Sequence, residues 1–203
     1  MALAGLALGA SAAAGPRDPR ERHTKAGEAI ARKAVLRRSD FRRGWRQTYH
    51  RPRRARCRAY NPNFSRLTRI GRARSEFSFG RRAYVISAVS VYLAPGQAAT
   101  VFETAARSAF LTCVRAEFVK AFARIGVRAR QVAKRTLVGP RLGSPARRFR
   151  LTLEVTSRGR AFRFDYDTVL FQVDRAIAQV SYQGYGEPER IVEGAARTVA
   201  SRL

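Results

Sequence analysis

Three consecutive strand patterns between residues 148 and 185 constrain the fold more than any other feature of this sequence. Residues 148–156 alternate apolar and polar side chains, which is typical of a half-buried strand. The segment Ser-Arg-Gly-Arg at 157–160 carries a hairpin turn signal, and a second tight turn separates the strands predicted over 161–173 and 175–185. Strands joined by such short turns are antiparallel, because a parallel pair needs a crossover of about a dozen residues or more.

The rest of the chain predicts an α+β sandwich around one core, with a mostly antiparallel sheet, a long central helix and terminal helices. Residues 1–14 form a signal-like segment, 15–24 a linker and 25–203 a single domain, in which 47–75 is mostly loop. The predicted elements of the domain are helices over 25–38, 95 to about 126 and 188–203, and strands over 75–79, 83–93, 127–138, 148–156, 161–173 and 175–185.

The long central helix has an apolar pattern that drifts along its length. Its first half places Val101 and Ala105 on one face, whereas Val114 and Phe118 in the second half lie nearly opposite. A straight surface helix keeps a single apolar stripe. Two interpretations follow: the helix breaks near residues 108–110, or its second half is covered by other elements on both sides.

The N-terminal segment resembles a secretory signal. Residues 1–14 are small, apolar and uncharged, and end in three alanines ahead of Gly15-Pro16. The positive residues that usually open such a signal are missing, so the alternative is an Ala/Leu-rich first helix of a cytosolic protein. We expect export, which gives an extracytoplasmic (secreted or cell-surface associated) protein. No apolar run reaches the about 18 residues needed to span a membrane, so no transmembrane segment is predicted in the mature chain.

The chain has two cysteines, Cys57 and Cys113. In an exported protein such a pair indicates one disulfide, which in the chain-entropy model would stabilise the fold by about 4 kcal/mol. The alternative is two unrelated buried thiols. The spacing matches no metal site, since neither cysteine belongs to a C-x-x-C motif or has paired histidines nearby.

The formal net charge is +27, from 41 Lys and Arg against 14 Asp and Glu, and it is distributed along the chain. Two interpretations stay open: a compositional bias toward arginine on a solvated surface, or a selected affinity for polyanions. The densest stretch lies between residues 42 and 58, and Trp45, Tyr49 and Tyr60 interleave with it. These aromatics either stack on bases or, as we favour, anchor the core. The candidate anion-binding residues are Arg42, Arg43, Arg46, Arg51, Arg53, Arg54, Arg56 and Arg58.

No motif for catalysis or cofactor binding is present. The sequence lacks H-E-x-x-H, C-x-x-C, G-x-S-x-G and the phosphate-binding loop, so we predict no catalytic residues, no metal and no cofactor. Asp165 and Asp167 are the best carboxylate pair for acid–base chemistry, and Arg163 shares their strand face. The favoured interpretation is a ladder of exposed opposite charges; a hydrolase is the less favoured one.

Several segments resemble exported actinobacterial proteins with the PsbP-like α/β sandwich. These include secreted lipoproteins and the extracellular sensor domains of PknH-type Ser/Thr kinases. The segments that carry the resemblance are 36–45, 57–68, 73–77, Cys113 and the tail 196–203. The resemblance implies an extracytoplasmic, non-enzymatic domain, with Cys57–Cys113 as a natural pairing. This chain departs from those relatives in having no lipid-attachment cysteine and no kinase or transmembrane segment.

We therefore expect an exported, non-enzymatic binding or sensor-like domain whose ligand the sequence does not identify. The alternative is a polyanion-binding protein that uses the stretch from Arg42 to Arg58. Its partners would be nucleic acid, an anionic wall polymer or an acidic membrane surface. Added salt should weaken any such attraction.

Overall fold

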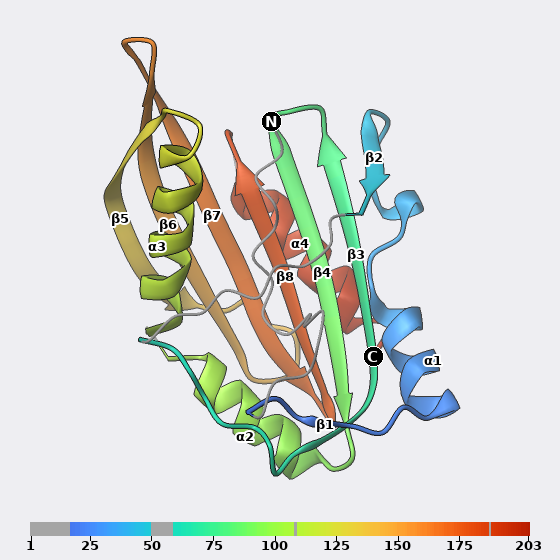
Figure 1. Ribbon diagram of the computed structural model, residues 1–203. Helices are drawn as coiled ribbons and strands as arrows, with labels where there is room; N and C mark the ends of the chain where they lie inside the picture. Colours follow the sequence, from blue (N-terminus) through green and yellow to red (C-terminus); the bar gives the residue numbers. More distant parts are fainter. Residues whose placement is uncertain (1–16, 50–58, 108, 187) are drawn as a thin grey trace.

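The computed structural model describes residues 17–49, 59–107, 109–186 and 188–203, which form an eight-stranded sheet with helices on both faces (Figure 1). The strand order is β1-β3-β4-β8-β7-β6-β5, and β2 pairs with β3. All pairs are antiparallel except β1 with β3, which confirms the predicted α+β class with a mostly antiparallel sheet. The strands are β1 (Arg20–Glu21), β2 (Trp45–Thr48), β3 (Thr68–Phe79), β4 (Ala83–Tyr92), β5 (Arg128–Val138), β6 (Ala146–Ser157), β7 (Arg160–Val173) and β8 (Ala176–Gly184). The helices are α1 (Lys25–Ala34), α2 (Pro95–Ala105), α3 (Ala109–Ala123) and α4 (Pro188–Ala200), with a 3₁₀ turn over Arg38–Asp40.

Both tight turns predicted between residues 148 and 185 are confirmed. At the β6–β7 hairpin, Ser157 pairs with Arg160, and Arg158 and Gly159 take φ angles of 49° and 75°. Asp174, between β7 and β8, has a φ of 47°. Positive φ at turn positions matches the right-handed twist of the strands that such turns connect.

The sheet separates two apolar cores. Helices α1 and α4 pack on one face, which we call the α4 face, and Val89, Phe171 and Val192 belong to its core. Helices α2 and α3 pack on the other, the α3 face, whose core includes Phe118 and Leu151. Figure 1 shows α2 and α3 in front of the sheet and α4 behind it. The strands β4 and β8 at the centre are therefore apolar on alternate residues toward the α4 face.

The single long helix predicted from residue 95 is wrong. The segment forms two helices, α2 and α3, with a break between Ala105 and Ala109. Ala98 and Val101 are buried in α2, and Val114 and Phe118 in α3. The drift of the apolar pattern therefore comes from a break in the helix, which was the first of the two interpretations. Each of the two helices presents its own apolar stripe to the α3 face.

The ordered fold also reaches into segments predicted as linker or loop. Within the predicted linker 15–24, β1 pairs in parallel with the start of β3. Within the predicted loop 47–75, β3 begins at Thr68 rather than at residue 75. The polar β1 and the Gly-containing start of β3 have little apolar patterning, so their extended structure depends on pairing with β4 and with each other. Residues 1–14, predicted as a signal-like segment, lie outside the described residues.

Close backbone contact fixes α1 on β3. A Cβ atom on Gly71 would lie 2.1 Å from the carbonyl carbon of Gly27, and a Cβ on Gly27 would lie 2.5 Å from the carbonyl oxygen of Ile70. Only residues without a Cβ allow this approach. The two glycines therefore set the distance at which the first helix covers the sheet.

Candidate ligand-binding site on the sheet

Strand β8 carries polar side chains on its α3 face although it is buried along its whole length. Gln179, Ser181 and Gln183 face this side, and Val180 and Tyr182 on the other side belong to the α4-face core. A strand buried on both faces is normally apolar on both. The glutamines and the serine therefore require an explanation from their surroundings.

Most of these polar groups satisfy one another. The Thr168 and Ser181 hydroxyl oxygens lie 2.7 Å apart, and Gln179 Nε2 donates to Ser181 Oγ at 2.9 Å. Gln179 Nε2 also reaches the Tyr166 hydroxyl at 3.4 Å, and burial raises the pKa of Tyr166 to about 12. Tyr166 therefore stays a neutral phenol at physiological pH, able to donate and to accept a hydrogen bond.

Gln183 is the exception, because neither its side-chain oxygen nor its side-chain nitrogen has a hydrogen-bond partner among the described residues. The residue is 2% exposed and lies between Tyr84 on β4 and Tyr166 on β7 in the strand register. Leaving a buried polar group unpaired costs about 1–3 kcal/mol, and native proteins satisfy the great majority of such groups. An amide kept here against that cost indicates a surface built to receive another polar group.

The polar surface continues across β4 to β3. Arg74 Nε donates to Glu76 Oε1 at 2.6 Å, and Glu76 shares a register row with Ile86 and Ser181. Burial raises the pKa of Tyr84, and the charge of Glu76 adds to that shift. We call this surface, which spans four strands, the polar face. It consists of Arg74, Glu76, Ser78, Tyr84, Tyr166, Thr168, Gln179, Ser181 and Gln183.

An apolar wall from α3 borders the polar face. The Phe118 ring lies 5.6 Å from that of Tyr166 and 5.1 Å from that of Phe164. Neutral hydrogen-bonding groups beside aromatic rings are the usual lining of a small-molecule site. No described histidine lies beside the hydroxyls of Thr168 and Ser181, since His23 pairs with Glu21 and Glu28 beside β1. Glu76, the carboxylate of the polar face, is bound to Arg74. The arrangement suits binding rather than nucleophilic chemistry.

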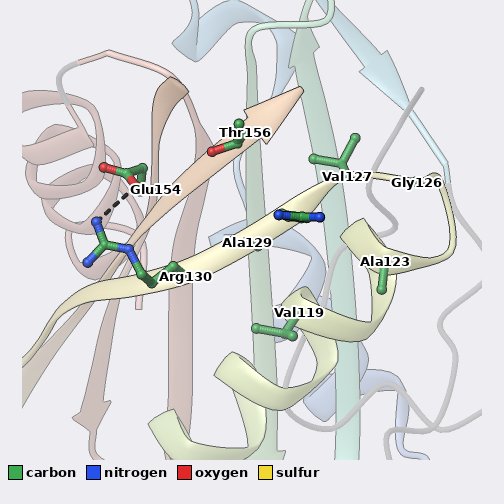
Figure 2. A pocket seen from close by; sticks show the side chains of 9 residues that line it. Val119, Ala123, Gly126, Val127, Ala129, Arg130, Glu154 and Thr156 are labelled. Atoms are coloured by element: carbon green, nitrogen blue, oxygen red, sulfur yellow. Dashed lines mark hydrogen bonds and ion pairs between the residues drawn. The ribbon is translucent and has the colours of Figure 1, made fainter. Parts of the chain in front are cut away.

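A pocket lies between α3 and the edge strand β5. It has a volume of about 680 Å³ and is lined by Val119, Val127 and Ala129 among others. Figure 2 shows the Arg130–Glu154 ion pair, 2.9 Å long, beside this pocket. Both of its charged partners are exposed and already paired. The pocket contains no unsatisfied buried group, and the polar face is the stronger candidate.

The prediction that Asp165 and Asp167 form an exposed charge ladder is wrong, because the two residues are 1% and 0% exposed on the α4 face. The predicted pairing with Arg163 is confirmed: its Nε donates to Asp165 Oδ2 at 2.9 Å. Thr152 also donates to Asp165, at 2.6 Å, and Arg148 binds Asp167. The acidic residues are buried because β6 supplies cationic and hydroxyl partners opposite them, which the β7 sequence alone does not reveal.

The predicted anion-binding stretch is described only in part. Arg42, Arg43 and Arg46 are exposed at β2 or just before it, and the Arg42 guanidinium lies 5.9 Å from the centre of the Phe79 ring. Trp45 is buried in the α4-face core, which confirms its role as an anchor, whereas Tyr49 is exposed. The remaining candidates, Arg51, Arg53, Arg54, Arg56 and Arg58, lie outside the described residues.

Cys113 lies on the buried side of α3. Its predicted partner, Cys57, lies outside the part of the chain that the structure describes. The disulfide therefore stays a prediction, and so does its contribution to stability.

The polar face was missed in the sequence analysis, although the sequence carries a signal for it. Gln179, Ser181 and Gln183 alternate with apolar residues on a strand predicted to follow a tight hairpin. That alternation alone is typical of a strand with one solvated face. The sequence of β8 alone does not reveal that this side is buried, because burial depends on the elements that cover the sheet.

Comparison of the sequence with protein-family models and with curated proteins finds no match to either. Among the described residues, no group of His, Cys, Asp and Glu side chains could hold a metal ion. Likewise, within the described ranges, no helix is long and apolar enough to cross a membrane.

Proposed function

We propose that this chain is an extracytoplasmic, non-catalytic binding domain of the sensor-like kind, with a PsbP-like sandwich and the polar face as its ligand-binding surface. The orphaned amide of Gln183 is the observation that carries the proposal. Its register neighbours Tyr84 and Tyr166 are neutral hydrogen-bonding groups, and Arg74 and Glu76 elsewhere on the polar face form an ion pair with each other. The ligand is therefore a small uncharged molecule with amide or hydroxyl groups. The signal-like segment and the resemblance to exported sensor domains support the location.

The environment of the carboxylates supports a non-catalytic role. A general acid and a general base require two groups whose surroundings drive their pKa values apart. Asp165 and Asp167 are instead both buried and both accept hydrogen bonds from arginine, so their surroundings are alike. Their side chains connect β6 to β7, and their oxygen atoms are occupied by partners within the protein.

The stability of two glutamine variants tests the site. Gln183→Leu should raise the free energy of unfolding by about 1 kcal/mol, because it removes a buried amide that has no partner. Gln179→Leu, the matched control on the same strand face, should lower it by about 1–3 kcal/mol, because it leaves hydroxyls unpaired. Urea denaturation measures both. A loss of stability in Gln183→Leu equal to that in Gln179→Leu would contradict the proposal.

A binding measurement completes the test. The probes are neutral sugars and capped dipeptides, screened by the shift that they cause in the melting temperature. A probe that stabilises the wild-type protein should lose its effect in Gln183→Leu and in Ser181→Ala. Retention of the full shift in both variants would place the ligand elsewhere.

Polyanion binding is a second candidate function, and the exposed arginines near β2 support it. Arg42, Arg43 and Arg46 have no ion pair with another described residue. Free guanidinium groups are the donors that bind phosphate and carboxylate most effectively. Neutralising Arg51, Arg53, Arg54 and Arg56 should abolish binding of a DNA oligonucleotide at physiological salt if this candidate is correct.

A further inference from the structure

One end of the sheet combines free arginines with exposed aromatic rings. The turn between β3 and β4, the end of β8 and the hairpin between β6 and β7 all lie at this end, at the top of Figure 1. Phe162 and Tyr185 are 46% and 40% exposed. We call this surface the basic–aromatic end; it consists of Arg81, Arg82, Arg158, Arg160, Phe162 and Tyr185.

The two rings are held in place by the core beneath them. Phe162 and Tyr185 contact each other edge to face, with ring centres 6.3 Å apart, and Tyr185 also contacts the buried Phe164 at 5.8 Å. The backbone N–H of Tyr185 donates to the carbonyl of Arg82 at 2.9 Å, which ties the ring to the β3–β4 turn. This approach requires Gly184, since a Cβ there would lie 2.2 Å from that same carbonyl oxygen. These contacts therefore hold the two aromatic rings in a defined position at this end of the sheet.

Positive charge flanks the aromatic pair on both sides. Arg81 and Arg82 lie on the side of Tyr185, and Arg158 and Arg160 on the side of Phe162. All four side chains are exposed, and none has an ion pair with a residue that the structure describes. Arg163, in contrast, is bound to Asp165 and does not count among the free cations.

We propose that the basic–aromatic end docks on a membrane surface rich in anionic phospholipid. Amphipathic aromatic residues settle at the headgroup level, and basic residues beside them gain from the negative surface potential. The residues come from separate turns at one end of the sheet, so they can contact one extended surface together. A single-stranded nucleic acid fits less well, because it needs ring faces free for stacking, and these rings partly cover each other.

Vesicle binding tests the proposal on the full chain. Sucrose-loaded phosphatidylcholine vesicles, with or without about 30 mol% phosphatidylglycerol, are sedimented at physiological salt. The fraction of protein that sediments with the vesicles is measured. We expect binding only to the anionic vesicles. Replacing Arg81, Arg82, Arg158 and Arg160 by Gln should lower the partition coefficient by about a hundredfold, and Phe162→Gln should lower it by about tenfold.

A matched control variant tests whether vesicle binding depends on this surface or only on the net charge of the protein. Arg66, Arg107, Arg141 and Arg147 are exposed near the opposite end of the sheet, and replacing them by Gln removes the same charge. This variant should retain most of the binding. Equal losses in the two quadruple variants would overturn the proposal, as would wild-type protein that fails to bind anionic vesicles. Tighter binding to a single-stranded oligonucleotide through the same arginines would replace it with a nucleic-acid interface.

The membrane surface is independent of the ligand site. Gln183→Leu alters the polar face without touching the basic–aromatic end, so its vesicle binding should equal that of the wild-type protein. Circular dichroism and melting temperature confirm that each variant is folded. A folded Gln183→Leu variant that loses vesicle binding would contradict the assignment of the docking residues.

Discussion

Arg148 on β6 binds Asp167 on β7 through two parallel hydrogen bonds inside the protein. Arg148 Nε donates to Asp167 Oδ1 at 2.9 Å, and Nη2 donates to Oδ2 at 2.8 Å. The remaining nitrogen, Nη1, donates to Glu189 at 3.0 Å and to Glu193 at 2.6 Å. One guanidinium thus connects two strands to α4, and its charge lowers the pKa of Glu189. The two residues are almost completely buried, and Arg150 Nε also donates to Asp167 Oδ2 at 2.7 Å. Loss of either residue therefore leaves a buried charge with fewer partners.

We predict that Arg148→Met lowers the free energy of unfolding by about 3–5 kcal/mol, because it leaves Asp167 buried with less compensation. The double variant Arg148→Met, Asp167→Leu should lose less than this, since it removes both charges and fills the space with apolar atoms. Urea denaturation of the two variants provides the measurement. Arg130→Met, which breaks the exposed pair with Glu154, serves as the control and should change stability by about 0–1 kcal/mol. A double variant less stable than Arg148→Met would contradict this account.

The ion pair between Arg202, just after α4, and Asp40 predicts that the stability of the protein depends on pH. Arg202 Nη1 donates to Asp40 Oδ2 at 2.8 Å, and the backbone N–H of Arg37 donates to the same oxygen at 2.7 Å. Partial burial would raise the pKa of Asp40, but these hydrogen bonds outweigh it and hold the pKa below the usual 3.8. A carboxyl with a depressed pKa stabilises the fold above its unfolded pKa, and this contribution is lost as the pH falls through the folded value.

Asp40→Asn should therefore be less stable than the wild-type protein at pH 7, and the difference should shrink as the pH falls below 3.8. Melting temperatures of the two proteins, measured from about pH 2 to about pH 7, test this pH dependence. Asp174→Asn, in the exposed β7–β8 turn, is the control and should follow the wild-type curve. A difference between Asp40→Asn and wild type that is constant over the whole range would show that Asp40 acts by packing alone.

The sequence predicts the local parts of this fold well. The hairpins around Gly159 and Asp174 need only turn residues between alternating strands, and both form as predicted. The break between α2 and α3 is likewise encoded in the shift of the apolar face after Ala105. The structure of β1 and β2 is not predictable in this way, because their polar sequences become strands only by pairing with β3.

The candidate site is harder to predict because it depends on which strands are neighbours. Gln183 looks solvated in the sequence, and only the strand order places it between Tyr84 on β4 and Tyr166 on β7. Asp167 is similar: its polarity predicts exposure, and Arg148, nineteen residues earlier, makes its burial tolerable. Long-range register brings these residues together, and the periodicity of one strand contains no information about it.

The expected disulfide leads to a prediction of mass and stability. If Cys57 and Cys113 are bonded, alkylation under denaturing conditions should label neither cysteine, and both after reduction. Reduction should lower the free energy of unfolding by about 4 kcal/mol, because it releases a long loop in the unfolded chain. The variant with both cysteines replaced by serine should match the reduced protein and should not respond to reductant. Labelling of Cys113 without reduction would contradict the bond.

Gly71→Ala should destabilise the protein through the contact between α1 and β3. The added methyl would lie 2.1 Å from the carbonyl carbon of Gly27, so the helix has to move away from the sheet. We expect a loss of about 1–3 kcal/mol, which is typical of overpacking in a well-packed interior. Gly194→Ala, on α4 where a Cβ would meet open space, is the matched control and should raise stability by up to about 1 kcal/mol through helix propensity. Chemical denaturation of both variants measures the difference, and equal stability of the two would show that α1 is not held against β3 at this distance.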